Sequence, residues 1–402
     1  MSISSLPAVS PGPKRPSLLA SGFRPTFLAA GIAALLLIPL WVLIWGYGVP
    51  LPSGWPPTLW HAHEMTFGFV AAAIAGFLLT AVPSWTGQRG FSGAPLLILT
   101  VLWLAARVLI ATAGAGLALA VMLTDVAFPV LLGVFIAPSL LRSGNRNTVL
   151  LLVLALFAAC NATFHWALLR RDPTLAFRSI LIAIDIALLL VTIIGGRIIP
   201  TFTGNALRSS GSPALIRTWP IIGPITIVSM AAVIPVDILW RDSRAAGVLA
   251  GLVAVLQAVR MLQWRSLASL RSPIVWVLHL GYVWLPVGFA LKALAILEGF
   301  ATSAFWLHAL TVGALATMIL AVMTRAALGH TGRPLVVEPA IALGYLLLLG
   351  AALVRVFGLG VLNLPYEAVI LVSATCWTLA FGVFIYVYAP ILWSPRVDGK
   401  PG

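Results

Sequence analysis

Residues 59–81 read Leu-Trp-His-Ala-His-Glu-Met-Thr-Phe-Gly-Phe-Val-Ala-Ala-Ala-Ile-Ala-Gly-Phe-Leu-Leu-Thr-Ala, an apolar run that opens with two histidines and a glutamate. A bilayer core about 30 Å thick is crossed by roughly 20 helical residues, so this run is long enough to cross it. An ionisable side chain in such a helix costs free energy unless it meets a partner, a cavity or a metal ion. His61, His63 and Glu64 are therefore the first candidate functional residues.

Apolar residues dominate the whole chain of 402 residues, of which 61% are hydrophobic and only 8% are charged. This composition excludes a soluble domain and predicts an all-α, polytopic membrane protein. About twelve transmembrane helices are expected, at 25–47, 59–81, 94–113, 117–140, 147–169, 177–198, 217–237, 244–262, 273–296, 303–325, 336–357 and 368–391.

Basic residues are distributed unevenly between the two sets of loops. With the N-terminus in the cytoplasm, the cytoplasmic side holds sixteen of the 24 lysines and arginines and the opposite loops hold seven. The positive-inside rule therefore predicts twelve spans with both termini cytoplasmic. Since the basic residues are spread over short turns that meet anionic headgroups, the net charge of +14 implies a lipid bilayer as partner and no nucleic acid.

The chain is expected to form one domain in the membrane. Residues 1–22 are expected to be a disordered cytoplasmic tail, residues 23–393 a single twelve-helix transmembrane domain, and residues 394–402 a second cytoplasmic tail. Both cysteines fall within expected spans, so no disulfide framework is predicted. The chain has no catalytic-triad, P-loop, dinucleotide-binding or CxxC zinc spacing, which argues against hydrolase and nucleotide chemistry.

Four of the six histidines are expected near the same end of the bundle, at one depth. His61 and His63 lie at the outer end of the second span, His165 at that of the fifth, and His308 at that of the tenth. Neutral imidazole binds haem iron, copper and zinc, and bundles build such sites from several helices at one depth. This layer predicts a metal site, whereas a single histidine would be read as a hydrogen-bonded structural residue.

His61 and His63 are two residues apart, so they point about 200° apart on a helix and suit two different centres. His61 and Glu64 share a face, which would let Glu64 orient an imidazole, take a proton or pair with Arg107. Two further carboxylates within spans, Asp125 and Asp185, could relay protons or balance Arg107.

Two arginines at the inner ends of spans, Arg197 and Arg325, could clamp haem propionates or a lipid headgroup, or serve only as positive-inside anchors. A Thr-Gly pair follows the second, sixth and tenth spans, at Thr86-Gly87, Thr203-Gly204 and Thr331-Gly332. This interval suggests three four-helix units, although glycine also commonly ends a helix.

Several blocks of the sequence together resemble the NnrS family. They are Trp-His-Ala-His-Glu-Met-Thr-Phe-Gly at 60–68, Thr-Ala-Val-Pro-Ser-Trp-Thr-Gly at 80–87, Gly-Arg-Ile-Ile-Pro-Thr-Phe-Thr at 196–203, and the segments 307–313 and 323–333. Ser84 and Thr26 depart from the family pattern, where asparagine and an aromatic residue would be expected. The resemblance implies a twelve-helix bacterial inner-membrane protein that contains haem and copper and takes part in denitrification and the response to nitric oxide.

The resemblance carries a ligand role over to His61, His63 and His308, whereas His165 rests on its depth alone. There is also a looser likeness to haem-copper oxidases, which arrange twelve helices with threefold pseudo-symmetry. This sequence lacks their histidine pair on the seventh helix, so copper would need other ligands here.

The resulting expectation is a haem- and copper-binding membrane protein that senses, scavenges or reduces nitric oxide at a histidine-ligated site in the outer half of the membrane. An oxidoreductase activity is left open, since it would need an electron donor that the sequence does not identify, with Glu64 available for proton handling. The alternatives are a metal or small-solute transporter that uses the histidine layer as a binding site, and a scaffold without redox activity.

Overall fold

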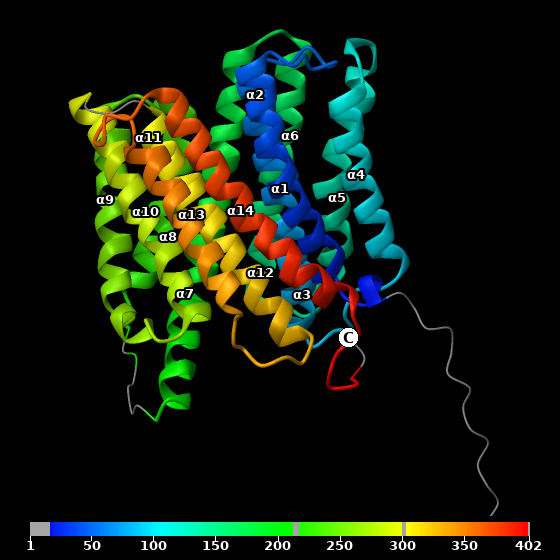
Figure 1. The fold of residues 1–402 in the computed structure, drawn as a ribbon, viewed down its shortest axis with the longest axis vertical. Coiled ribbons are helices and arrows are strands. Elements are labelled where there is room, and N and C mark those ends of the chain that lie inside the picture. The colour runs from blue at the N-terminus through cyan, green and yellow to red at the C-terminus, as the bar shows by residue number, and fades with distance from the viewer. Residues whose placement is uncertain (1–16, 212–215, 217, 300–302, 401–402) are drawn as a thin grey trace, which may run out of the picture.

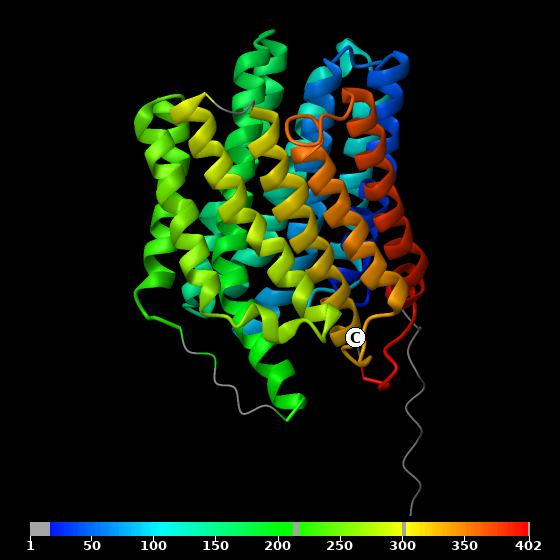
Figure 2. The same ribbon diagram turned by 60° about the vertical axis from the view of Figure 1, so that its left-hand side comes forward.

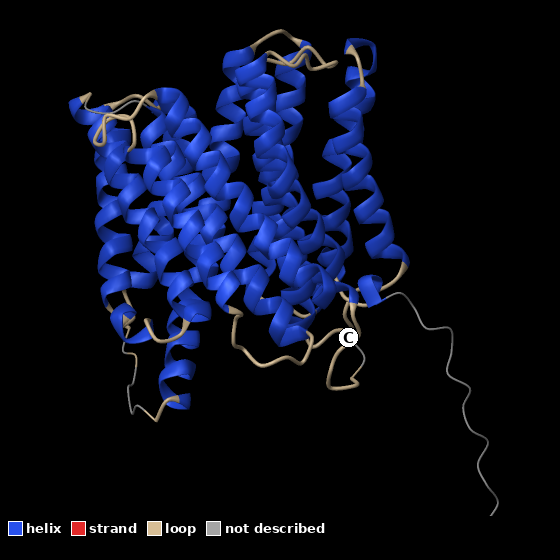
Figure 3. Cartoon of the chain, in the orientation of Figure 1, coloured by secondary structure: helices blue, strands red, loops and turns tan. Residues whose placement is uncertain are grey.

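The computed structural model describes residues 17–211, 216, 218–299 and 303–400. Within these ranges the chain consists of helices and loops, without strands (Figure 3). Twelve helical spans are long and apolar enough to cross a membrane, which confirms the predicted fold class. The spans pack side by side, and the described chain ends lie at the lower end of the bundle in Figure 1, called the terminal end below.

Nine of the described spans are single uninterrupted helices. They are α1 (Phe23–Tyr47), α4 (Ala94–Thr112), α5 (Ala118–Arg142), α7 (Pro173–Ser209), α8 (Ile222–Trp240), α9 (Arg244–Leu262), α10 (Pro273–Glu298), α13 (Pro339–Phe357) and α14 (Tyr366–Trp393). The fifth span joins a short 3₁₀ turn, η4 (Arg146–Thr148), to α6 (Val149–Leu169). The second and tenth spans each contain a π-helical segment: α2 (Pro57–His63), η2 (Glu64–Val70) and α3 (Ala71–Thr86), and α11 (Ser303–His308), η6 (Ala309–Ala316) and α12 (Thr317–His330).

The expected limits of several spans differ from the structure by a few residues, and those of the sixth span differ most. The sixth span was expected at 177–198, but α7 covers Pro173–Ser209 and extends below the bundle at the terminal end (Figure 2). Hydropathy detects only the apolar length of a helix, whereas backbone hydrogen bonding continues into the polar residues beyond the membrane. Of the expected disordered tail, residues 1–16 lie outside the described residues, while Ser17–Leu19 form a short 3₁₀ helix and Leu19 accepts a hydrogen bond from the Gly93 amide.

The second and sixth spans are the most buried of the twelve, followed by the ninth and tenth. The second, sixth, ninth and tenth spans therefore form most of the interior of the bundle. The Thr-Gly pairs do not share one structural position. Gly87 and Gly332 have positive φ angles of 66° and 75° after the ends of α3 and α12, whereas Thr203-Gly204 lies inside α7.

Each π-helical segment begins directly after a histidine of the candidate layer, His63 in the second span and His308 in the tenth. π-Helical turns leave carbonyl groups free of the regular ladder and occur often at functional sites. In η2 the carbonyl of Gly68 accepts a hydrogen bond of 3.0 Å from the indole nitrogen of Trp103. The local backbone of the second span is therefore fixed by a neighbouring helix beside the histidines.

The first and last spans are joined at the terminal end by Arg24, whose side chain is almost completely buried. One guanidinium nitrogen, Nη1, donates to the carbonyl oxygens of Leu392 at 2.9 Å and Ser394 at 2.6 Å. Hydrogen bonds from charged groups contribute about 1.5–3 kcal/mol each. We expect Arg24→Met to lower the free energy of unfolding in detergent by at least this amount, measured by denaturant titration.

The matched control is Arg89→Met, because Arg89 is an exposed arginine in the loop after α3. It should leave the unfolding free energy within the range of ordinary surface substitutions, about 0.5 kcal/mol. Equal stability of the two variants would contradict the role given to Arg24.

Candidate functional site

His63 lies at the centre of a buried polar cluster near the end of the bundle opposite the termini. Its Nδ1 is 3.1 Å from Glu64 Oε1, and its Nε2 is 3.1 Å from both Asn161 Oδ1 and Asp125 Oδ2. The amide nitrogen of Asn161 donates to Asp125 Oδ2 at 2.8 Å, which leaves the Asn161 oxygen facing the imidazole. Since these oxygens are all acceptors, the ring can donate to both sides only as an imidazolium.

Arg107 on α4 connects the two carboxylates of this cluster. Its Nη1 donates to Glu64 Oε1 at 2.9 Å, and its Nη2 donates to Asp125 Oδ1. A β-carbon at position 68 would lie 2.8 Å from Arg107 Nη1, so Gly68 gives the guanidinium its space. The guanidinium and the imidazolium of His63 together balance the charges of Glu64 and Asp125. Such pairing is what allows ionised groups to remain in a low-dielectric interior.

The second imidazole of the cluster belongs to His165 on α6. Its Nε2 lies 3.0 Å from Asp125 Oδ2, and its side chain is 3% exposed. His63, Asp125 and His165 each offer one ligand atom, and these atoms lie within 4.8 Å of one another. Two imidazole nitrogens and one carboxylate oxygen suit copper, zinc or iron. We call these three residues the buried triad.

Aromatic rings surround the buried triad. The ring centroid of Trp55, in the loop before α2, is 5.3 Å from that of His63 and 5.6 Å from that of His165. Phe164 lies 4.4 Å from His63, and Phe67 lies 5.1 Å from it. These apolar walls limit water around the imidazoles, which strengthens every electrostatic interaction within the cluster.

His61 lies on the other side of the second span and lines a separate cavity of about 1040 Å³. Its ring centroid is 4.5 Å from that of Trp41 on α1. Among the residues that the structure describes, nothing hydrogen bonds to the buried His61 Nδ1. The His-x-His pair is therefore divided between the cavity and the buried triad, as the angle between positions two residues apart predicts.

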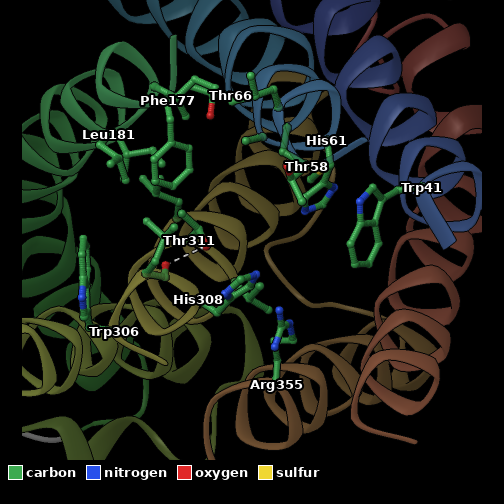
Figure 4. A pocket seen from close by; sticks show the side chains of 18 of the residues that line it. Trp41, Thr58, His61, Thr66, Phe177, Leu181, Trp306, His308, Thr311 and Arg355 are labelled. Carbon is green, nitrogen blue, oxygen red and sulfur yellow. Dashed lines mark hydrogen bonds between the residues drawn. The ribbon is translucent and has the colours of Figure 1, made fainter. Parts of the chain in front are cut away.

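The cavity is enclosed by side chains from the second, sixth, ninth and tenth spans together with α1, α13 and α14. His308 reaches it from the tenth span, near Arg355 of α13 and opposite the indole of Trp41 (Figure 4). Four of its lining residues are basic, namely Arg178, Arg241, Lys292 and Arg355, and one, Asp242, is acidic. The cavity thus combines two histidines and four basic residues with an otherwise mostly apolar wall.

The structure does not bring Arg197 and Arg325 to the histidines. Arg197 Nη1 donates to Asn147 Oδ1 at 2.6 Å, and the Arg325 guanidinium lies 3.7 Å from the ring centroid of Phe202. Both arginines lie in the terminal halves of their spans, and neither lines the cavity. The basic residues that do line the cavity are the four named above.

Two other expectations concern the carboxylates. Asp125 does balance Arg107, as one of the sequence alternatives proposed. Glu64 pairs with Arg107, but its imidazole partner is His63 rather than His61.

Asn161 was not singled out from the sequence, since a lone amide in an apolar span carries no distinctive signal. Its position four residues before His165, one helical turn away, is the feature that could have indicated it.

Comparison with known proteins gives one family. A family model described as NnrS protein matches residues 17–396. Curated proteins contain no match to the chain. The matched segment covers the twelve candidate spans and so includes both the cavity and the buried triad.

Replacement of Arg107 should strongly destabilise the protein, because it leaves two buried carboxylates with one imidazolium. Breaking a buried ion pair costs about 3–5 kcal/mol. We expect Arg107→Met to lose this much unfolding free energy. Arg107→Lys should lose less, because the ammonium keeps a positive charge beside the carboxylates, but it should still lose some, because it cannot reproduce the forked contact with both. Thermal and denaturant unfolding in detergent would measure both losses.

Arg170→Met is the matched control, because Arg170 is an exposed arginine at the same end of the bundle. The account of the cluster would be contradicted if Arg107→Met unfolded at the same temperature and denaturant concentration as the wild-type protein and the control.

Proposed function

Because the chain belongs to the NnrS family, we propose that it is a haem- and copper-binding membrane protein of the nitric oxide response. Family membership suggests the nitric oxide response, and the residues of the two sites support the cofactor assignment. The observation that carries the proposal is the separation of His61 from His63. One histidine borders a large cavity, and the other belongs to a compact group of potential metal ligands.

The cavity fits a haem in size, ligands and charge. Its volume of about 1040 Å³ lies just above the usual range for cofactor pockets, about 300–1,000 Å³. His61 and His308 supply imidazoles from two interior spans, and the buried Nδ1 of His61 lacks a hydrogen-bond partner among the described residues. Arg178 and Arg355 in the lining could pair with the two carboxylates that a haem carries. When bound, haem would supply an iron that takes a histidine ligand and binds nitric oxide.

The buried triad fits a copper ion by its donor set. Two imidazoles and a carboxylate also suit zinc, so the family resemblance favours copper over zinc. A metal at His63 Nε2 would replace the proton that this nitrogen donates in the cluster. Glu64 holds the other ring nitrogen and thereby fixes the orientation of the imidazole, which is the usual task of a carboxylate behind a ligating histidine. In this proposal Glu64 is a positioning residue.

The chain's own residues would keep the two centres separate. Trp55, Phe67 and Phe164 close the triad against solvent, while the mostly apolar cavity carries four basic side chains in its lining. Nitric oxide is small and apolar enough to enter either environment. We place both centres in the outer half of a bacterial inner membrane with cytoplasmic termini, because the described terminal end carries most of the basic loop residues.

Single histidine substitutions test the cofactor assignment. His61→Ala and His308→Ala should lower the haem content of the purified protein by more than half and leave bound copper near the wild-type level. His63→Ala and His165→Ala should do the reverse, because these side chains belong to the other site. Optical spectra and elemental analysis on the same samples measure both quantities.

His279→Ala is the matched control. His279 is a buried histidine on α10, paired with Thr203 and Ser266 in the terminal half of the bundle, and its loss should remove neither cofactor. A wild-type protein that stays colourless when expressed with added haem and copper would overturn the proposal. The cavity would then be read as the binding site of a transporter.

Two exposed valines that flank α13 test the orientation. Val336 lies in the loop before α13, at the terminal end, and Val361 lies in the loop after it. In a background without Cys160 and Cys376, Val361→Cys should react with a membrane-impermeant maleimide on intact spheroplasts. Val336→Cys should react only after the membrane is permeabilised.

The two positions are matched in residue type and exposure, 76% for Val336 and 68% for Val361, so intrinsic reactivity will not separate them. The reverse labelling pattern would place the termini outside the cytoplasm.

A further inference from the structure

A second group of buried charges lies beside the cavity and is separate from the buried triad. Asp185 on α7, Asp237 on α8 and Lys292 on α10 are 3%, 5% and 1% exposed. Lys292 Nζ donates to Asp237 Oδ2 at 2.5 Å. The same ammonium lies 5.1 Å from the ring centroid of Trp306. Three spans thus direct two carboxyl groups and one ammonium at one buried position.

The hydrogen bonds of this group pair one carboxyl group with the ammonium and leave the other carboxyl group without a cation of its own. The single buried ammonium is engaged by Asp237, and within the described part of the chain nothing hydrogen bonds to Asp185 Oδ2. Arg241, the other cation near Asp185, lies over the Trp306 ring at 5.8 Å. A second buried carboxylate without its own ion pair would cost several kcal/mol. A proton on one carboxyl group removes that cost.

The carboxyl group of Asp185 is also a neighbour of that of Asp237. Two neighbouring carboxylates repel each other in a buried site, so one of them keeps its proton when only one ammonium is present. Asp237 has the ammonium of Lys292 to stabilise its charge. The proton therefore belongs on Asp185, whose free oxygen can exchange it.

The group of buried charges borders the cavity. Lys292 and Arg241 line the cavity that His61 and His308 border. The titratable and charged groups facing Asp185 are Asp237 and Arg241 from α8 and its C-terminal end, Lys292 from α10 and Cys160 from α6. Because Lys292 borders both Asp185 and the cavity, the group adjoins the cavity, and Lys292 can stabilise the carboxylate that forms when Asp185 releases its proton.

We propose that Asp185 is a protonated, exchangeable carboxylic acid that stores a proton next to Lys292, behind the wall of the cavity. The site would supply a proton to a reaction in the cavity or take one from it. It consists of this chain's own residues and does not depend on the presence of haem or copper.

Infrared spectroscopy of the purified protein tests the proposal directly. A protonated carboxylic acid has a carbonyl stretch separate from those of carboxylates and amides. We expect such a band in the wild-type protein, a shift of the band in heavy water, and a loss of intensity as the pH rises. Asp185→Asn should remove the band, while Lys292→Met should strengthen it, because two carboxyl groups without the ammonium will bind a second proton.

Asp242→Asn is the matched control, since Asp242 is an exposed carboxylate that lines the same cavity. It should leave the band unchanged. The proposal is overturned if the wild-type protein has no such band, if the band persists in Asp185→Asn, or if the band neither exchanges with heavy water nor responds to pH. The heavy-water and pH measurements need only the wild-type protein, so a poorly folding variant does not leave the question open.

Discussion

The angle between successive residues of an α-helix governs the organisation of both candidate centres. Each residue turns the helix by about 100°, so His61 and His63 point to opposite sides of the second span. Because this span lies in the interior of the bundle, both sides are enclosed by other spans. One side meets α5 and α6, which supply Asp125, Asn161 and His165. The other side opens into the cavity that the tenth span borders with His308.

The backbone of the two histidine-bearing spans is adapted to this arrangement. In each, a π-helical segment begins at the residue after the histidine. The segment in the second span contains Gly68, whose missing side chain makes room for Arg107 and whose carbonyl accepts from Trp103. Arg107 then neutralises two carboxylates around His63. A small residue, a widened helical turn and one arginine together make a charged cluster tolerable inside a membrane.

The number and approximate place of the spans could be predicted from the sequence, because hydropathy records the length of apolar helices. The division of the His-x-His pair also followed from helical geometry. What could not be predicted was side-chain pairing between distant spans. Arg197 and Arg325 were expected near the cofactor because arginine suits carboxylates, but position along the bundle separates them from the histidines. Asn161 and the basic residues that line the cavity depend on how helices pack, which one sequence does not reveal.

The central claim is that two centres lie on opposite sides of the second span. A high-resolution cryo-electron microscopy map of the protein, purified after expression with haem and copper, tests it most directly. The account predicts planar density in the cavity beside His61 and His308, together with a separate ion peak between His63, Asp125 and His165. Lipid density in the cavity and an empty triad in a metal-replete sample would contradict it.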